Sequence, residues 1–307
     1  MRTFCFLLLL IPLVMSAQEP PLSEKNFRIY STKIAREVSL QDIAADMQNY
    51  DVLFFGEEHN DSVTHYAQHE LLKELHAQFG SNLALSMEMF DRDVQLVMNE
   101  YLSGFIREKN FLKDARAWSN YRDYRPLVEF AKEQKLGIIC TNAPTRYTNL
   151  AGRKGQQELL KLPPDAQRFF APLPYDTASG GYYEKLMAMM QPPLGDTSKA
   201  HMPAMAMHGF NLIMAQSLWD ATMAYSIAEY DRLHPKKKIL HINGKFHSDE
   251  HFAIVTQLKK YAPLLKSLVI SSADDAAFPQ IDWSKYAKFG DYIIITDPKI
   301  PKTFKSE

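Results

Sequence analysis

The sequence predicts an α/β fold in which helices cover both faces of a mostly parallel β-sheet, with a helical insertion between its two halves. Apolar segments with the length of buried strands occur at residues 52–55, 83–87, 136–140, 239–242, 268–271 and 292–295. Amphipathic segments typical of helices lie between them, at residues 64–79, 94–102, 126–134 and 251–261. Because strands that are apolar throughout are buried on both faces, their alternation with helices indicates a parallel sheet.

The middle of the chain, from about residue 152 to residue 232, differs from the two ends. It contains no strand candidate, and prolines such as Pro163-Pro164 divide it. We interpret it as a helical insertion or lid within a single domain of residues 40–300. Residues 18–39 are expected to form a leader before that domain.

The first residues of the chain predict export. Arg2 precedes an apolar run from Phe4 to Val14, and the small residues Ser16 and Ala17 follow. This is the plan of a cleaved secretory signal, so we expect residues 1–17 to be removed and the protein to work in the periplasm or cell envelope. The run is shorter than the roughly 20 residues of a membrane span, although an uncleaved anchor is the alternative. We interpret the mature chain as soluble.

The cysteine count excludes a thiolate zinc site, and the net charge argues against a nucleic-acid partner. Loss of Cys5 with the signal leaves Cys140 alone, which excludes a zinc site made of thiolates. The chain has 35 basic and 36 acidic residues and a net charge of −1. Nucleic-acid-binding proteins usually carry a basic field, so this balance argues against such a partner.

Two Gly-x-x-His motifs, Gly56 to His59 and Gly244 to His247, each follow a predicted strand. Ligands of open parallel sheets bind beyond the carboxyl ends of the strands, where both motifs fall. Glycine allows positive φ and close backbone approach, and the two histidines can face one another if their strands are neighbours. Taken singly, each motif is also typical of an ordinary helix start.

Further polar residues join these histidines in a candidate site. Glu57 and Glu58 lie within the first motif, Glu88 follows the strand at 83–87, and His208 stands beside a glycine. One use of such residues is to hold Zn²⁺, Mn²⁺ or Co²⁺ with a position open for water. His59, Glu88 and His247 would then bind the metal, with Glu57 or Glu58 as the base. The other use is to surround a larger ligand, with an imidazole that binds either an iron or a propionate group.

A helical face carries three more histidines at positions 65, 69 and 76. Their spacing resembles a helical metal grip, but His65 lacks the following glutamate of the H-E-x-x-H motif. We interpret this face as a solvated flank.

The sequence resembles the ChaN-like family, which belongs to a superfamily with the Tiki and TraB proteins and the erythromycin esterases. The matching motifs occur in the expected order between about residues 40 and 260: Gly56-Glu-Glu-His-Asn-Asp61, Met87-Glu-Met-Phe90, Tyr124-Arg-Pro-Leu-Val128, Asn142-Ala-Pro144, Gln216-Ser-Leu-Trp-Asp-Ala-Thr-Met-Ala224 and Asn243-Gly-Lys-Phe-His247. Many members are lipoproteins, but this chain lacks the cysteine that lipid attachment requires.

The resemblance implies a haem-binding protein of iron uptake at the bacterial cell envelope, with tyrosine ligation, dimer formation and a transport partner. Tyr147 is our first choice of iron ligand, because it should leave the carboxyl end of a strand next to Arg146. His59, His208 and His247 are further haem-binding candidates, and Tyr182 and Tyr183 are alternative tyrosines. Because Tiki members are metal-dependent proteases, the resemblance also implies the alternative of a metal-dependent hydrolase.

Overall fold

The computed structural model describes residues 21–190 and 211–304. The predicted signal at residues 1–17 and the candidate ligand His208 lie outside these residues. The described chain folds around one eight-stranded sheet with the strand order β2-β1-β8-β7-β3-β6-β4-β5. The two central strands are therefore β7 and β3, and the edges are β2 and β5.

Six of the strands form the parallel part of the sheet, and all six were predicted. They are β3 (Val52–Glu57), β4 (Leu83–Asp91), β5 (Gly137–Asn142), β6 (Lys238–Gly244), β7 (Ser267–Asp274) and β8 (Tyr292–Thr296). Every pairing among them is parallel. The prediction of a mostly parallel α/β fold is confirmed.

The remaining two strands lie in the segment expected to be a leader. β1 (Phe27–Ser31) pairs antiparallel with β8, and β2 (Arg36–Glu37) pairs with β1. The prediction was wrong for these residues, because β1 buries only alternate side chains. Phe27 and Ile29 reach the core, and two apolar residues are too few to stand out as a strand.

Ten α-helices connect and cover the strands. They are α1 (Leu40–Asp46), α2 (Ser62–Phe79), α3 (Gln95–Leu102), α4 (Glu108–Asp114), α5 (Tyr121–Glu133), α6 (Thr145–Lys154), α7 (Pro164–Gln167), α8 (Gly180–Met190), α9 (Leu212–Leu233) and α10 (Ile254–Tyr261), within the described ranges. Two short 3₁₀ turns, η8 (Lys245–His247) and η9 (Asp249–His251), follow β6.

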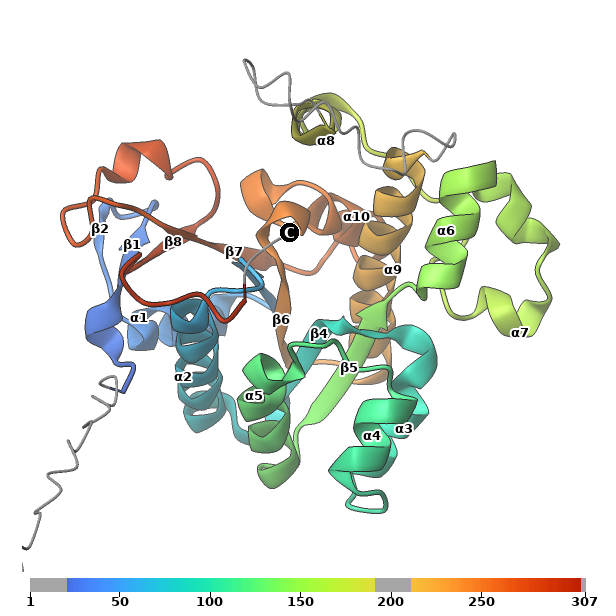
Figure 1. Cartoon of the computed structure of the whole chain (residues 1–307), viewed down its shortest axis with the longest axis horizontal. Helices are drawn as coiled ribbons and strands as arrows, with labels where there is room; N and C mark the ends of the chain where they lie inside the picture. Colours follow the sequence, from blue (N-terminus) through green and yellow to red (C-terminus); the bar gives the residue numbers. More distant parts are fainter. Residues whose placement is uncertain (1–20, 191–210, 305–307) are drawn as a thin grey trace, which may run out of the picture.

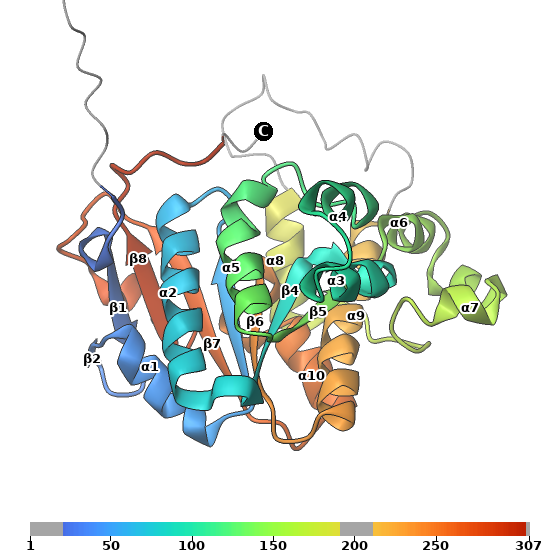
Figure 2. The same cartoon turned by 90° about the horizontal axis from the view of Figure 1, so that it is seen from below.

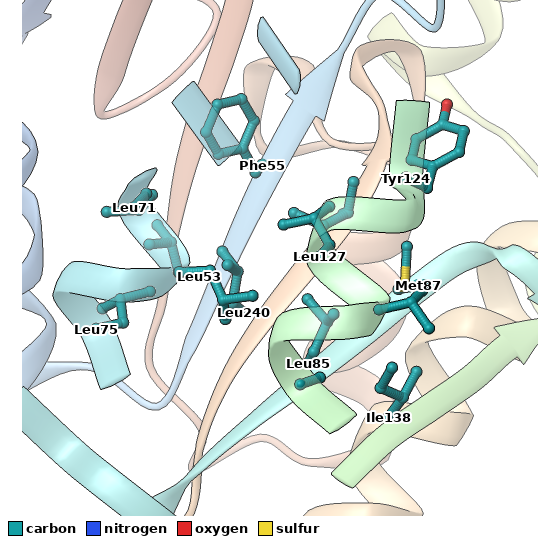
Figure 3. Close-up of a cluster of buried hydrophobic side chains, with 14 of the residues drawn as sticks. Leu53, Phe55, Leu71, Leu75, Leu85, Met87, Tyr124, Leu127, Ile138 and Leu240 are labelled. Carbon is teal, nitrogen blue, oxygen red and sulfur yellow. The ribbon is translucent and has the colours of Figure 1, made fainter. Parts of the chain in front are cut away.

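The helices form one layer on each face of the sheet (Figures 1 and 2). On one face α2 and α5 pack against the strands, as Leu71 and Leu127 do against Leu53 and Leu85 (Figure 3). On the other face α9 and α10 cover the sheet, and the apolar side chains in contact there include Met223, Ile227, Val255, Phe54 and Val269. The core is thus two apolar layers on either side of buried strands.

Helix α9 corrects part of the interpretation of residues 152–232. We expected this whole range to be an insertion or lid, but α9 packs along the sheet as a core helix. Small residues such as Ala221 and Ala224 lie in its buried face, so the helix carries less apolar bulk than a typical core segment. The last residues of α6 and the helices α7 and α8 lie in the remainder of the predicted insertion that the structure describes.

Both edges of the sheet are shielded from further pairing. At the β5 edge, Nε2 of Gln95 donates to the carbonyl of Ile138 and its Oε1 accepts from the N–H of Cys140, each at 2.8 Å. The opposite edge is the two-residue β2, whose Arg36 and Glu37 are exposed. None of the helices in the described residues has the length and hydropathy needed to cross a membrane.

Candidate functional site

The two Gly-x-x-His turns lie side by side at the carboxyl end of the sheet. Strands β3 and β6 are parallel neighbours, and Glu57 is in register with Gly244. A Cβ on Gly244 would lie 2.8 Å from Nε2 of His59, and one on Gly56 would lie 2.8 Å from Cα of Lys245. Neither glycine has a positive φ. Both positions therefore require glycine because neighbouring atoms lie too close to leave room for a side chain.

The first histidine is held by a buried carboxylate. Nδ1 of His59 lies 2.8 Å from Oε1 of Glu57, and the hydroxyl of Tyr124 donates to the same oxygen at 2.6 Å. Gln68 donates to the other oxygen. An ionised carboxylate only accepts, so Nδ1 of His59 carries a proton and Nε2 is its free position. Figure 3 shows the hydroxyl of Tyr124 pointing away from the apolar cluster below it.

Burial alone would raise the pKa of Glu57, but the charge of His65 and hydrogen bonds from His59 and His65 hold it well below its usual value. For His59, burial lowers the pKa, while the hydrogen bond with Glu57 and the charges of Glu88 and Glu57 raise it above its ordinary value overall. Glu57 was one of the two bases that we proposed. That role belongs to the hydrolase alternative; in the structure Glu57 is bonded to Tyr124, Gln68 and His59.

His65 belongs to this anchoring group, which corrects the prediction of a solvated flank. The residue is buried, its Nδ1 lies 3.4 Å from Oε2 of Glu57, and its Nε2 lies 3.2 Å from the carbonyl of His59. Burial lowers the pKa of His65, but the charge and hydrogen bond of Glu57 outweigh it and raise the pKa to about 9.

The second histidine has a matching anchor on the other face of the sheet. Nδ1 of His247 lies 2.6 Å from Oδ1 of Asp220 in α9, and the hydroxyl of Tyr182 donates to Oδ2 of Asp220 at 2.7 Å. Gln216 lies 3.2 Å from the same Nδ1. Burial lowers the pKa of His247, but the charges of Glu88 and Asp220 outweigh it and raise the pKa to about 9. Each histidine is thus backed by a carboxylate that a tyrosine hydroxyl holds.

Glu88 lies between the two imidazoles. Its Oε2 accepts from the N–H of Gly244 at 2.7 Å, and its Oε1 lies 3.5 Å from Nε2 of His247. The structure therefore brings His59, Glu88 and His247 together, as the sequence predicted. Within residues 21–190 and 211–304, no group of three or more His, Cys, Asp or Glu residues is arranged to hold a metal ion.

A cleft of about 570 Å³ opens over His59 and His247. Its walls carry the aromatic rings of Trp118, Phe246 and Phe304. The ring of Trp118 meets that of His59 edge-on, with centroids 5.2 Å apart. Glu58, the second proposed base, lies at the rim and is paired with Lys245 at 2.6 Å. The cleft combines a polar floor with apolar walls.

None of the three tyrosines predicted as iron ligands lines the cleft. Tyr147 is buried in α6, where it packs against Phe170 in an apolar cluster and receives a hydrogen bond from Arg146. It does not line the cleft. Tyr182 is committed to Asp220, and burial raises its pKa well above the usual range. Tyr183 is 41% exposed, so it is the one of the three that solvent reaches freely.

Sequence reasoning gave no role to Tyr124, Gln68 or Asp220. Tyr124 and Asp220 lie within motifs that carry the family resemblance, yet nothing local to them shows which histidine they meet. Asp220 carried a usable signal, because an acidic residue within an apolar helix is buried only when it is paired.

Comparison with known proteins places these features in a family. The model of the family described as "Haem-binding uptake, Tiki superfamily, ChaN" matches residues 43–258, most of the chain. The chain belongs to the ChaN family. This match confirms the resemblance inferred from the motifs.

A solved structure of similar fold supports the fold of this ChaN family member. A structure described as cofacial heme binding to ChaN of Campylobacter jejuni has a TM-score of 0.68 and 18% identity, and covers 90% of this chain and 100% of that chain. The type III effector HopBA1 has a TM-score of 0.44 and 12% identity, over 84% of this chain and 94% of that chain. No curated protein sequence matches the chain.

Proposed function

We propose that this ChaN family member is an exported haem-binding protein of haem or iron uptake, and that it binds haem in the cleft with Nε2 of His59 towards the iron. The observation that carries the proposal is the anchored imidazole. Nδ1 of His59 is fixed on the ionised Glu57, and Nε2 remains on the side of the cleft. Histidines that bind metals commonly donate their other N–H to a carboxylate, which fixes the ring and raises its basicity.

The residues around the cleft fit the chemistry of a porphyrin. Trp118, Phe246 and Phe304 offer apolar surface to a flat ring. Burial of that surface is favourable by about 25 cal/mol per Å², although only part of this becomes affinity. Haem supplies the iron as cargo, and the chain supplies the imidazole and the apolar walls.

The proposal favours His59 over Tyr147 as the ligand. Tyr147 is buried in its own apolar cluster, whereas the side chain of His59 is 37% exposed in the cleft. His247 is the nearest second imidazole, and it is bound to Asp220 as His59 is to Glu57.

A hemin titration followed by the Soret band tests haem binding. We expect a saturable shift with the purified protein, and a loss of at least tenfold in affinity with His59→Ala, which corresponds to about 1.4 kcal/mol. Tyr147→Phe should leave the affinity unchanged. The matched control is His234→Ala, since His234 is an exposed imidazole after the C-terminal end of α9. A spectrum of free hemin alone with the wild-type protein would refute the proposal.

Export, dimer formation and delivery to a transport partner complete the proposal. The N-terminus of the mature protein is expected at Gln18, after the predicted signal. Sequencing of the protein recovered from the periplasm checks this, and an intact Met1 in every fraction would contradict it. Light scattering with and without hemin measures dimer formation.

A metal-dependent hydrolase is the second candidate. The observation in its favour is that Oε1 of Glu88 lies 3.5 Å from Nε2 of His247, although the described His, Cys, Asp and Glu residues form no group of three arranged to hold an ion. A panel of peptides and esters with added Mn²⁺, Co²⁺ or Zn²⁺ tests it. Hydrolysis that is lost in Glu88→Gln, while hemin affinity is unchanged, would support this function. An inactive wild-type protein with all three metals would exclude it.

A further inference from the structure

We propose that Lys302 is a positioning residue of the cleft, because it fastens a C-terminal strap that brings Phe304 into the cleft wall. The strap consists of residues 297–304, which follow β8. Lys302 does not itself line the cleft. This inference rests on the proposed haem binding, and it adds a residue that shapes the cleft from outside.

The strap leads from the carboxyl end of β8 to the turn that carries His59. The side chain of Ile300 packs against the hydrophobic core and so anchors the first half of the strap. Beyond it, the hydroxyl of Ser62 donates to the carbonyl of Pro301 at 3.1 Å. Figure 2 shows the strap passing the N-terminal end of α2, which begins at Ser62. The second half of the strap therefore lies against the β3–α2 turn.

The last residues of the strap are bonded to Asn60, which follows His59 in the chain. The N–H of Thr303 donates to the carbonyl of Asn60 at 2.8 Å, and Nδ2 of Asn60 donates to the carbonyl of Phe304 at 3.0 Å. Nη2 of Arg122 donates to the carbonyl of Thr303 at 2.8 Å. These bonds hold Phe304 in the wall of the cleft, where the residue is 40% exposed.

Lys302 pairs with three carboxylates at the carboxyl end of the sheet. Its Nζ lies 2.8 Å from Oδ2 of Asp61, 3.5 Å from Oε2 of Glu58 and 3.8 Å from Oδ1 of Asp274, the last residue of β7. Burial lowers the pKa of Lys302, but the hydrogen bond with Asp61 and the charges of the three carboxylates raise it above its ordinary value overall. The ammonium group is therefore the positive charge that these carboxylates share.

Glu58 extends this pairing to the second Gly-x-x-His turn. Its Oε1 lies 2.6 Å from Nζ of Lys245, and its Oε2 is the oxygen that faces Lys302. Each carboxylate oxygen thus takes one lysine, the first from the second turn and the other from the strap. Glu58 and Lys245 both line the cleft with Phe304. Lys302 therefore contacts the cleft through residues that form its rim.

Loss of the ammonium group would release the strap. The three carboxylates lie within 3.8 Å of one nitrogen, so without its charge they repel one another. The repulsion is strongest at Asp61, whose side chain is only 4% exposed and is poorly screened by solvent. The strap would then depend on hydrogen bonds at exposed positions, such as that from Ser62 to Pro301. Because such bonds contribute little singly, we expect the strap to detach beyond residue 300 and to remove Phe304 from the cleft wall.

A double-mutant cycle followed by hemin titration tests whether Lys302 acts through Phe304. Lys302→Met keeps most of the length of the side chain and removes its charge, and Phe304→Ala removes the ring from the wall. We expect each single variant to lose about tenfold in hemin affinity. Because both changes remove the same wall, the double variant should lose no more than Phe304→Ala does.

Two control variants and a measurement without ligand keep other effects apart. Lys302→Arg keeps the charge and should bind hemin within about threefold of the wild type. Lys299→Met is the matched control, because Lys299 is an exposed lysine of the same strap, and it should bind as the wild type does. Hydrogen exchange at the N–H of Thr303, which is bonded to Asn60, reports on the strap directly. It should be at least about tenfold faster in Lys302→Met and unchanged in Lys299→Met.

Each contrary outcome has a distinct meaning. If the two losses multiply in the double variant, Lys302 does not act through Phe304, and its positioning role is wrong. Unchanged exchange at Thr303 in Lys302→Met would show that the strap is fastened without this lysine, which also overturns the inference. If the wild type does not bind hemin, the proposed function fails, while exchange at Thr303 still decides whether Lys302 fastens the strap.

Discussion

Replacement of Asp220 with asparagine tests whether His247 depends on the negative charge of Asp220 or only on the hydrogen bond between the two side chains. Asparagine keeps the shape of the side chain and an oxygen that can accept from Nδ1 of His247, at a position now 2.6 Å from that nitrogen. The hydroxyl of Tyr182 can accept from the new amide as readily as it donates to the carboxylate. The substitution therefore removes one negative charge with little change of packing.

The size of the effect follows from the pKa of His247. That pKa is raised from 6.5 to about 9, because the charges of Glu88 and Asp220 outweigh the effect of burial. A rise of this size corresponds to about 3.5 kcal/mol at about 1.4 kcal/mol per unit. With burial unchanged and one of the two charges removed, we expect the pKa of His247 to fall by at least about one unit.

The sign of the pH dependence follows from linkage. A histidine whose folded pKa is raised contributes stability that is fully present below its unfolded pKa and is lost as the pH rises through the folded pKa. The wild type should therefore lose stability between about pH 6.5 and pH 9. In Asp220→Asn the loss of stability that comes from deprotonation of His247 should be smaller. The part that belongs to His65, whose pKa is also about 9, should remain.

Two measurements check the reasoning. Proton NMR of the imidazole Cε1–H, assigned with His247→Gln, gives the pKa of His247 in both proteins. Urea unfolding at pH 6, 7.5 and 9 gives the pH dependence of stability. An unchanged pKa of His247 in Asp220→Asn would refute the view that the charge of Asp220 holds this imidazole protonated.

Three other substitutions test the packing around the site. Gly244→Ala places a methyl group 2.8 Å from Nε2 of His59, so the ring must move, and we expect hemin titration to show at least a tenfold loss of affinity. Asp61→Ala removes the side chain that accepts from the N–H groups of residues 63 and 64 at the start of α2 and also from Thr296 and Lys302. It should cost at least about 1–2 kcal/mol in urea unfolding. Phe54→Ala empties a fully buried position in β3 and should lower the unfolding free energy by about 3–5 kcal/mol, with an unchanged m-value.

The parallel sheet could be predicted from the sequence because its central strands are apolar on both faces. β3 is buried at every position, so its pattern does not depend on which helix covers it. β1 was missed because it lies near an edge and buries alternate residues only. α9 was taken for part of a lid, since its buried face is built from small residues whose packing partners are distant in the sequence.

The candidate site, like the fold, has residues that the sequence predicts and residues that it does not. The positions of His59, His247 and Glu88 follow from strand ends, and strand ends are predictable from a local pattern. Their anchors are not, because Asp220 reaches His247 from a helix on the other face of the sheet. Tyr124 was also missed because we predicted the start of its helix at residue 126. In the structure α5 begins at Tyr121 and contains Pro126. A helix start judged from a proline can be wrong by a full turn.

The side-chain amide of Gln95 has a consequence for how copies of this chain can meet. It binds Ile138 and Cys140 as a peptide group of a neighbouring strand would, and so occupies the hydrogen-bonding positions that an incoming chain needs. At the other edge, β2 is only two charged residues long and offers little to pair with. The sheet therefore resists growth at either end. We expect copies of this protein to associate through helices and loops, and to resist fibril formation even when they are crowded together.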